Sequence, residues 1–143
     1  MISTSVKVDT KAVDRLLNKM IKEQPRKVKT ALSKTASEGI NTLLDRTKKG
    51  KGLYGRFKGY NAKYAEYRRE KGRQTNHVDL NFSGDMWAAL KVTKNTSEKA
   101  VISFTQQAEA VKAQGNNKLR PWFGLTDKEQ DRLRDVFKRE LFR

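Results

Sequence analysis

Cysteine is absent from this chain of 143 residues, and histidine occurs only once, at His77. Without cysteine the chain has no disulfides, thiolate metal sites or cysteine nucleophiles. No Gly-x-Ser-x-Gly, Walker or paired-histidine zinc motif occurs, so the residues that common catalytic mechanisms combine are missing. We therefore expect no enzymatic activity, no cofactor and no bound metal.

Long apolar segments are also absent. No run approaches the roughly 18 residues of a membrane helix, and there is no apolar core of a signal peptide. These absences favour a soluble protein that assembles in a reducing cytoplasm without membrane contact. A chain of this length suits one domain that buries about two thirds of its unfolded surface. We therefore expect a single domain over residues 1–143.

Positive charge is what the sequence has in excess. The chain carries 32 Lys and Arg against 16 Asp and Glu, which gives a formal charge of +16. Such an excess would repel itself in an isolated compact monomer, so it indicates an anionic partner. Over half of it lies in residues 46–73, where eleven basic residues face only Glu66 and Glu70.

The first part of this basic segment has the composition of a loop. Four glycines occur within residues 48–59, and apolar anchors are sparse. We predict a flexible basic loop at about residues 47–60. Its cations are expected to face a DNA channel or a partner: Lys48, Lys49, Lys51, Arg56 and Lys58. Tyr54 and Phe57 could stack on bases or fasten the loop to the core, and we favour fastening.

Residue periodicity outlines the rest of the fold. Residues 3–8 alternate like a short edge strand, and apolar spacing predicts two helices that are separated at Pro25, the second of them the longest. Further patterns predict a helix over residues 61–71, a β-hairpin over residues 92–104, and a short exposed helix over residues 106–114 before a Gly-Asn-Asn loop. Thr126 and Glu129 form a capping box that opens the last helix. The fold class is therefore α+β, with a small antiparallel sheet packed with N-terminal helices and a C-terminal helix.

Two short segments carry large aromatic side chains. In Arg-Pro-Trp-Phe-Gly at residues 120–124, the proline and glycine keep both aromatics outside regular elements. Leu-Asn-Phe-Ser-Gly-Asp-Met-Trp at residues 80–87 leads into a short helix with Ser83 as its expected N-cap. Their large side chains are candidate subunit-interface or core anchors, because Trp and Arg are frequent interface anchors. These candidates are Trp87, Arg120, Trp122 and Phe123.

Asp79 and Asp85 are the best candidates for a metal site. They flank Ser83 and Gly84 beside the basic segment, and they could in principle hold Mg²⁺ together with backbone oxygens. We favour structural roles, with Asp85 stabilising a helix N-terminus and Asp79 paired with a nearby Lys or Arg. We interpret His77 as a loop residue.

The two aromatic segments, in this order and after the Tyr/Lys-rich residues 60–71, resemble a phage family. It comprises the virion morphogenesis or tail completion proteins of the Mu type, which are related to HK97-type tail components. The resemblance implies a structural neck or tail protein, either a tail completion protein, a tail terminator or a head–tail connector. It also implies a homo-oligomeric ring, a hexamer, around the DNA channel. The implied partners are other neck, connector and tail tube proteins and sequence-independent double-stranded DNA, and the implied location is the virion after assembly in the host cytoplasm.

A second hypothesis from another class is a stand-alone basic DNA-binding protein that acts without sequence preference. It explains the charge but not the ordered motifs. It predicts a monomer or dimer whose DNA affinity depends steeply on salt, whereas the ring hypothesis predicts only weak binding by isolated subunits. A small nuclease is a third alternative, and the sparse catalytic residues argue against it.

Overall fold

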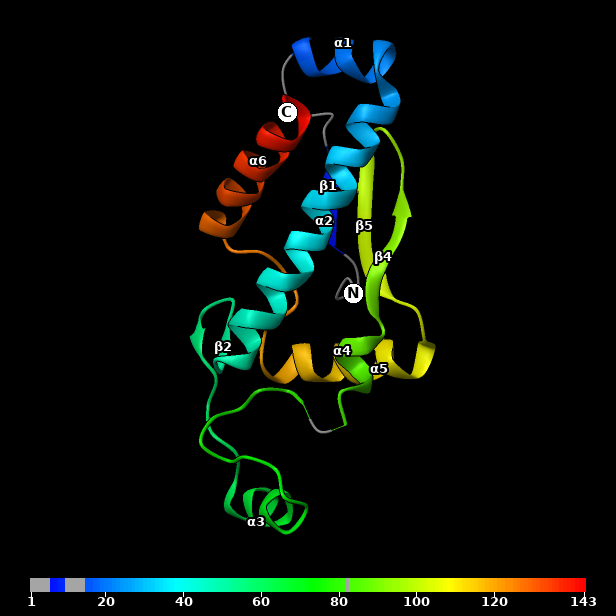
Figure 1. Cartoon of the computed structure of the whole chain (residues 1–143). Coiled ribbons are helices and arrows are strands. Elements are labelled where there is room, and N and C mark those ends of the chain that lie inside the picture. The colour runs from blue at the N-terminus through cyan, green and yellow to red at the C-terminus, as the bar shows by residue number, and fades with distance from the viewer. Residues whose placement is uncertain (1–5, 10–14, 82) are drawn as a thin grey trace.

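The computed structural model describes residues 6–9, 15–81 and 83–143 (Figure 1). The elements in chain order are β1 (Val6–Asp9), α1 (Arg15–Glu23), α2 (Pro25–Lys48), β2 (Lys51–Gly52), β3 (Gly55–Arg56), α3 (Ala62–Glu70), α4 (Asp85–Ala88), β4 (Leu90–Asn95), β5 (Lys99–Phe104), α5 (Gln107–Leu119) and α6 (Asp127–Leu141). Strands β1, β4 and β5 form an antiparallel sheet that packs against helices. The predicted α+β class is confirmed.

β5 is the central strand of this sheet, with β1 and β4 antiparallel to it on either side. The predicted edge strand is found as β1, although residues 3–5 of that prediction lie outside the described residues. The predicted hairpin is found as β4 and β5, and its turn is closed by the Thr96 amide, which donates to the Lys99 carbonyl at 2.8 Å. Ala100 and Ile102 of β5 are fully buried, so the centre of the sheet contributes to the core.

α2 is the longest helix of the described residues and joins the sheet to α6. Pro25 stands at its start, where the missing amide hydrogen has no helical partner to lose. Val28, Leu32 and Leu43 on its inner face are fully buried. At Gly39 a Cβ atom would come within 3.2 Å of Ile102, so the absence of a side chain lets α2 approach β5 closely. α2 therefore packs on β4 and β5 and also against α6 (Figure 1).

α6 begins with the predicted capping box. The Thr126 hydroxyl accepts a hydrogen bond from the Glu129 amide at 3.3 Å, and the Glu129 carboxylate accepts one from the Thr126 amide at 2.8 Å. Leu133, Phe137 and Leu141 then enter the core at helical spacing. The prediction of this last helix is therefore confirmed in both its start and its buried face.

Replacing Thr126 by alanine is expected to lower the free energy of unfolding by about 1 kcal/mol. Alanine removes the hydroxyl acceptor and leaves the Glu129 amide without its capping partner. Equilibrium urea unfolding measures the change. Thr126→Ser keeps the hydroxyl and should unfold near the wild-type midpoint. A wild-type midpoint for Thr126→Ala as well would contradict a stabilising role of this box.

α5 is longer than its sequence predicts. The predicted helix ends before the Gly-Asn-Asn loop, whereas the structure continues it to Leu119. The loop prediction is wrong because hydrogen bonds to the segment directly after the helix offset the low helix propensity of Gly115. The Asn117 side-chain oxygen accepts the amides of Trp122 and Phe123, each at 2.9 Å. The end of α5 is thereby fixed to the following loop.

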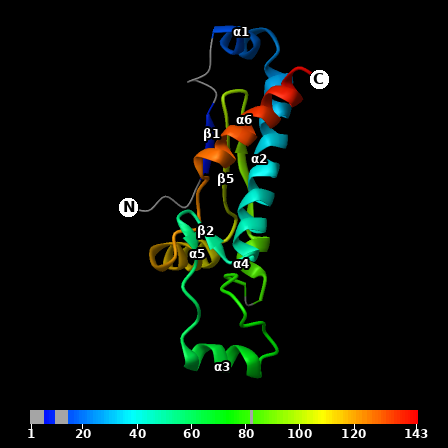
Figure 2. The same ribbon diagram turned by 90° about the vertical axis from the view of Figure 1, so that its left-hand side faces the viewer.

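α3 stands at the end of the molecule opposite to α1 and the C-terminus (Figures 1 and 2). The chain enters α3 through residues 57–61 and leaves it through residues 71–81, which contain neither helix nor strand. The Asn61 side chain caps the first turn by accepting the Tyr64 amide at 2.8 Å, so the predicted short helix is confirmed. We refer to residues 57–81 as the α3 end of the molecule.

Candidate nucleic-acid interface

The segment predicted as a flexible basic loop is folded along most of its length. α2 continues through Lys48, and β2 and β3 form an antiparallel hairpin. The Leu53 amide in this hairpin donates to the Pro121 carbonyl at 2.9 Å. The prediction of a poorly packed loop is therefore wrong here, because a backbone contact distant in sequence holds the segment. We call residues 48–58 the basic hairpin.

Three of the four glycines that suggested flexibility have steric roles instead. Gly50 and Gly55 have φ values of 77° and 123°, which residues with a side chain rarely adopt. At Gly52 a Cβ atom would lie 2.3 Å from the Pro121 carbonyl oxygen and 2.5 Å from the Phe57 ring. Both the turns of the basic hairpin and its contact with the rest of the subunit therefore require glycine.

The two aromatic residues of the basic hairpin have opposite environments. Phe57 packs against the hydrophobic core, so the fastening interpretation is confirmed for this residue. Tyr54 lies in the turn between β2 and β3 and is 89% exposed. The same interpretation is therefore wrong for Tyr54, which leaves an aromatic ring in solvent on a cationic hairpin.

The five cations assigned to the contact surface are all exposed: Lys48, Lys49, Lys51, Arg56 and Lys58. Over residues 48–73, nine exposed cations stand against two exposed carboxylates, a balance of +7. The basic hairpin and α3 lie in the same half of the molecule (Figures 1 and 2). Residues 15–34, toward the opposite end, also carry seven exposed cations against one exposed carboxylate, so the fold places basic surface at both ends of the molecule.

Arg46 belongs to the basic segment in sequence but is largely internal. Its guanidinium donates to the carbonyl oxygens of Trp122 and Gly124 and pairs with the Glu129 carboxylate. Only 10% of its side chain is exposed. Arg46 therefore holds the aromatic loop, residues 120–126, between α2 and the start of α6. The signal that distinguishes Arg46 from its exposed neighbours is helical spacing, because it lies three residues after buried Leu43 and seven after buried Gly39.

Arg68 is a second internal cation, with only 2% of the residue exposed. Its guanidinium donates to the carbonyl oxygens of Gln74 and Asn81, both at 3.1 Å, and lies 3.4 Å from the Asp79 carboxylate. The same group lies 4.7 Å from the centre of the Tyr60 ring. Arg68 thus holds the segments of the α3 end together through internal hydrogen bonds. Its charge does not add to the exposed basic surface.

Asp79 is the acceptor at the centre of this network. It accepts hydrogen bonds from the Gln74 side chain at 2.8 Å and from the Asn81 amide at 3.0 Å, in addition to its pairing with Arg68. Burial raises the pKa of the neighbouring Tyr60 phenol, and the negative charge of Asp79 contributes to the rise. The predicted pairing of Asp79 with a nearby cation is confirmed.

Asp85 and His77 occupy local structural positions. Asp85 lies in the first turn of α4 and accepts the Ser83 hydroxyl at 2.9 Å. The N-cap is Gly84, at φ 87°, so the assignment of Ser83 as N-cap is wrong. His77 lies in a loop with its Nε2 atom 2.5 Å from the Lys48 carbonyl oxygen. In the part of the chain that the structure describes, no group of three or more His, Cys, Asp or Glu could hold a metal ion.

Asp79→Asn is expected to lower the free energy of unfolding by about 1–3 kcal/mol, because buried Arg68 then loses its charged partner. Asp85→Asn is the comparison, with an expected loss of no more than about 1 kcal/mol. Urea unfolding measures both. Incubation of each protein with DNA and Mg²⁺ or Mn²⁺ should give no cleavage. Metal-dependent cleavage by the wild type that is lost when Asp79→Asn and Asp85→Asn are combined would instead favour the nuclease hypothesis.

Two of the four candidate anchors lie in the core of the molecule. Trp122 is fully buried, and its indole nitrogen donates to the Ala113 carbonyl at 3.3 Å. Its ring centre lies 5.3 Å from that of Phe123 and 6.4 Å from that of Phe104. Phe123 is only 8% exposed. Of the two roles considered for Trp122 and Phe123, the structure supports the core anchor.

The other two candidate anchors are half-buried beside the α3 end. Lys48 places its ammonium 5.4 Å from the centre of the Trp87 ring. Arg120 donates from its Nε atom to the Lys58 carbonyl at 3.5 Å. Trp87 and Arg120 therefore lie next to the basic hairpin, on the side where it meets α4 and α5.

Comparisons with protein-family models, curated proteins and solved structures gave no match for this chain. Among the helices of the described residues, none combines the length and the apolar character that crossing a bilayer requires.

Proposed function

We propose that this chain is a structural protein of a phage neck or tail whose subunits form a ring around double-stranded DNA. The observation that carries the proposal is the balance of +7 in exposed charge over residues 48–73. In a closed ring, every copy would turn its basic hairpin toward one axis. Repetition would then multiply a modest attraction for phosphate.

The contacts that we propose are with the DNA backbone. Four of the five exposed cations on the basic hairpin are lysines, which act on phosphates as flexible point charges rather than as readers of base edges. A rigid hairpin would hold these charges at a constant distance from the axis. Weak, sequence-independent attraction suits a channel through which DNA must pass.

The resemblance to the Mu-type virion morphogenesis proteins supports the ring and the virion location. Trp87 and Pro121, one residue from each of the two aromatic segments that carry the resemblance, both contact the basic hairpin. We propose a hexamer that joins other neck, connector or tail tube proteins. Its role would be tail completion, tail termination or head–tail joining, after assembly in the host cytoplasm.

The alternative is a stand-alone basic protein that binds DNA without sequence preference. The same surface charge supports it, so DNA binding alone does not separate the two functions. The number of subunits in the assembled protein separates the two functions. A monomer or dimer with tight DNA binding and steep salt dependence would favour the alternative.

Electron microscopy of the concentrated protein tests the proposed ring. We expect closed rings of six subunits with a central opening, together with weak DNA binding by the dissociated subunit. Sedimentation velocity gives the subunit count independently. A protein that stays monomeric or dimeric at every concentration and binds DNA tightly would overturn the ring and leave the stand-alone function.

A further inference from the structure

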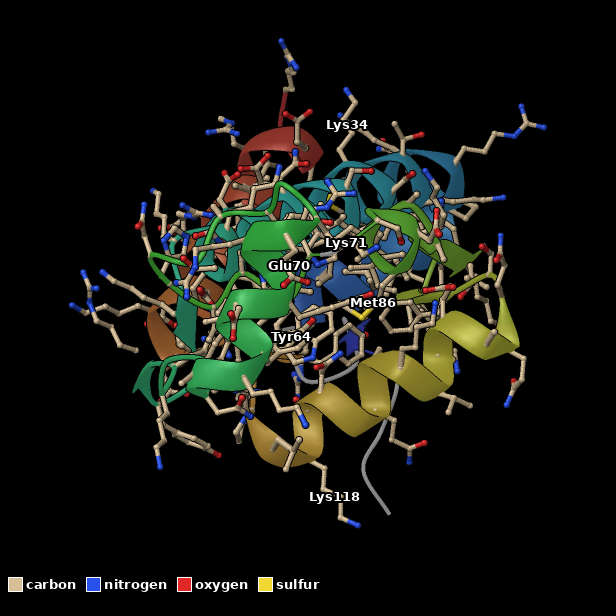
Figure 3. All side chains as sticks on the ribbon, turned by 90° about the horizontal axis from the view of Figure 1, so that it is seen from below. Lys34, Tyr64, Glu70, Lys71, Met86 and Lys118 are labelled. Carbon is tan, nitrogen blue, oxygen red and sulfur yellow. The ribbon has the colours of Figure 1, made fainter. Side chains whose placement is uncertain are left out.

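Tyr54 is the most exposed of the large hydrophobic side chains that the structure describes. It lies with Leu53 in the turn between Gly52 and Gly55, which pair with each other across β2 and β3. Seen from below, β2 and β3 lie at the left edge of the molecule (Figure 3). No ring, cation or hydrogen-bonding group among the described residues pairs with the Tyr54 side chain. Both faces of its ring are therefore open to a ligand.

The other tyrosine rings and the Trp87 ring already have partners within the molecule. Tyr60, Tyr64 and Trp87 line a cavity of about 550 Å³ between α3, α4 and α5. The centre of the Tyr64 ring lies 5.3 Å from that of Tyr60 and 6.1 Å from that of Tyr67. The Lys48 ammonium covers the Trp87 ring at 5.4 Å. The fold thus uses these rings, whereas it leaves the ring at the tip of the basic hairpin unused.

The tip of the basic hairpin is held in place on both sides of Tyr54. The Leu53 amide donates to the Pro121 carbonyl, and a Cβ atom at Gly124 would come within 3.2 Å of the Leu53 side chain. On the other side, Phe57 packs against the hydrophobic core. A ligand that stacks on the ring therefore does not have to order a flexible loop, which would reduce its affinity.

Two cations of the basic hairpin lie directly opposite each other. Lys51 and Arg56 are partners in the register of β2 and β3, and both are exposed. Residues directly opposite in an antiparallel pair project to the same face, where like charges repel each other. Neither residue forms an ion pair with a carboxylate of the described residues. A bound phosphate would relieve this repulsion, so the pair favours an anionic ligand beside the open ring.

We propose that Tyr54 stacks on an unpaired base of single-stranded DNA, while Lys51 and Arg56 bind the adjacent phosphates. The proposal rests on the proposed contact between the basic hairpin and DNA, and it extends that contact from the backbone to a base. Inside a duplex, neighbouring base pairs cover both faces of each base, so a single strand supplies the face that the ring needs. Because every base has such a face, this contact does not depend on sequence.

Fluorescence anisotropy with two labelled strands of about 12 nucleotides tests the stacking. One strand is oligodeoxyadenosine, and the other has the same phosphates but abasic sugars. We expect the wild type to bind the first strand about tenfold more tightly than the abasic strand. Tyr54→Ala should bind the first strand about tenfold more weakly and lose this preference, whereas Tyr54→Phe keeps the ring and should behave as the wild type. The slope of log affinity against log salt should not change, because no phosphate contact is lost.

Two controls separate stacking from other causes. Phe142→Ala also removes an exposed ring, 61% exposed and at the end of the molecule opposite to α3, and it should leave binding of both strands unchanged. A DNA duplex should bind the wild type and Tyr54→Ala equally, because the cations of the basic hairpin remain.

The outcomes distinguish this proposal from the proposed function. Equal affinity of the wild type for the two strands, or wild-type binding by Tyr54→Ala, overturns the stacking and leaves the contact with duplex DNA in place. If Tyr54→Ala binds DNA normally but fails to assemble, the ring belongs to a contact with protein instead. If the wild type binds neither strand nor duplex, both the stacking and the proposed contact between the basic hairpin and DNA are wrong.

Discussion

Replacing Trp122 by alanine is expected to lower the free energy of unfolding by about 3–5 kcal/mol. The side chain is fully buried, packs against Phe104 and Phe123, and donates its indole hydrogen to Ala113. Truncation would leave a cavity that the surrounding helix and strand cannot close, and it would leave the Ala113 carbonyl without this donor. Urea or thermal unfolding of the purified variant measures the loss.

Tyr54→Ala is the control for this experiment. It also truncates a large aromatic ring near the aromatic loop, but at a position 89% exposed, so its stability should stay within about 0.5 kcal/mol of wild type. A Trp122→Ala protein as stable as Tyr54→Ala would contradict the core role. If such a protein also failed to assemble, the Trp122 ring would belong to a contact between subunits.

Changing four lysines of the basic hairpin to glutamine is expected to weaken DNA binding by roughly 10³-fold at low salt. The substituted residues are Lys48, Lys49, Lys51 and Lys58. Loss of four phosphate contacts should also reduce the slope of log affinity against log salt by roughly 3–4. Because all four side chains are exposed, thermal stability should change little. Fluorescence anisotropy with a DNA duplex over a salt series measures both quantities.

The matched control removes the same charge from the opposite end of the subunit. Its four lysines lie on α1, at the start of α2 and near the end of α6: Lys22, Lys27, Lys29 and Lys138. If attraction depended on net charge alone, both variants would lose the same affinity. That equality would remove the basic hairpin from the proposed DNA contact, whereas loss confined to the hairpin variant supports it.

Elements whose signals are local could be predicted from the sequence. Pro25 marks the start of α2, and the Thr126 and Glu129 pair marks the start of α6, because these residues act within one helical turn. Alternation likewise predicts the β4–β5 hairpin, since its side chains point to the two faces of the sheet in turn. For these elements, the interactions that determine the structure join residues that are close together in the sequence.

The basic hairpin could not be predicted, because a contact with residues distant in the sequence determines it. The length of α5 could not be predicted because it depends on hydrogen bonds to residues that lie beyond one helical turn. The glycines of residues 48–59 look flexible until the Pro121 carbonyl is placed beside Gly52. Gly115 looks like a helix end until Asn117 receives the amides of the aromatic loop. Composition indicates how flexible a segment would be in isolation. In this protein, contacts with the rest of the fold restrict that flexibility.

The candidate nucleic-acid interface also has features that could be predicted from the sequence and features that could not. Exposure of the five hairpin cations follows from their charge, but Arg46 and Arg68 belong to the same basic run and are internal. Helical spacing places Arg46 on the inner face of α2, whereas its carbonyl and carboxylate partners distinguish Arg68 from the exposed residues. The cavity between α3, α4 and α5 could not be predicted either, because its walls combine α3 with α5, which lie far apart in the sequence.

The hydrogen bonds from Arg46 to the aromatic loop have a mechanical consequence. The loop receives the Leu53 amide of the basic hairpin at Pro121, while Arg46 fixes the same loop to the start of α6. A force applied at the tip of the basic hairpin would therefore be transmitted to the core through a short series of hydrogen bonds, without a flexible segment in between. If DNA moving through a channel pushed on the basic hairpin, the hairpin would bend little. The force would instead be distributed over the whole subunit.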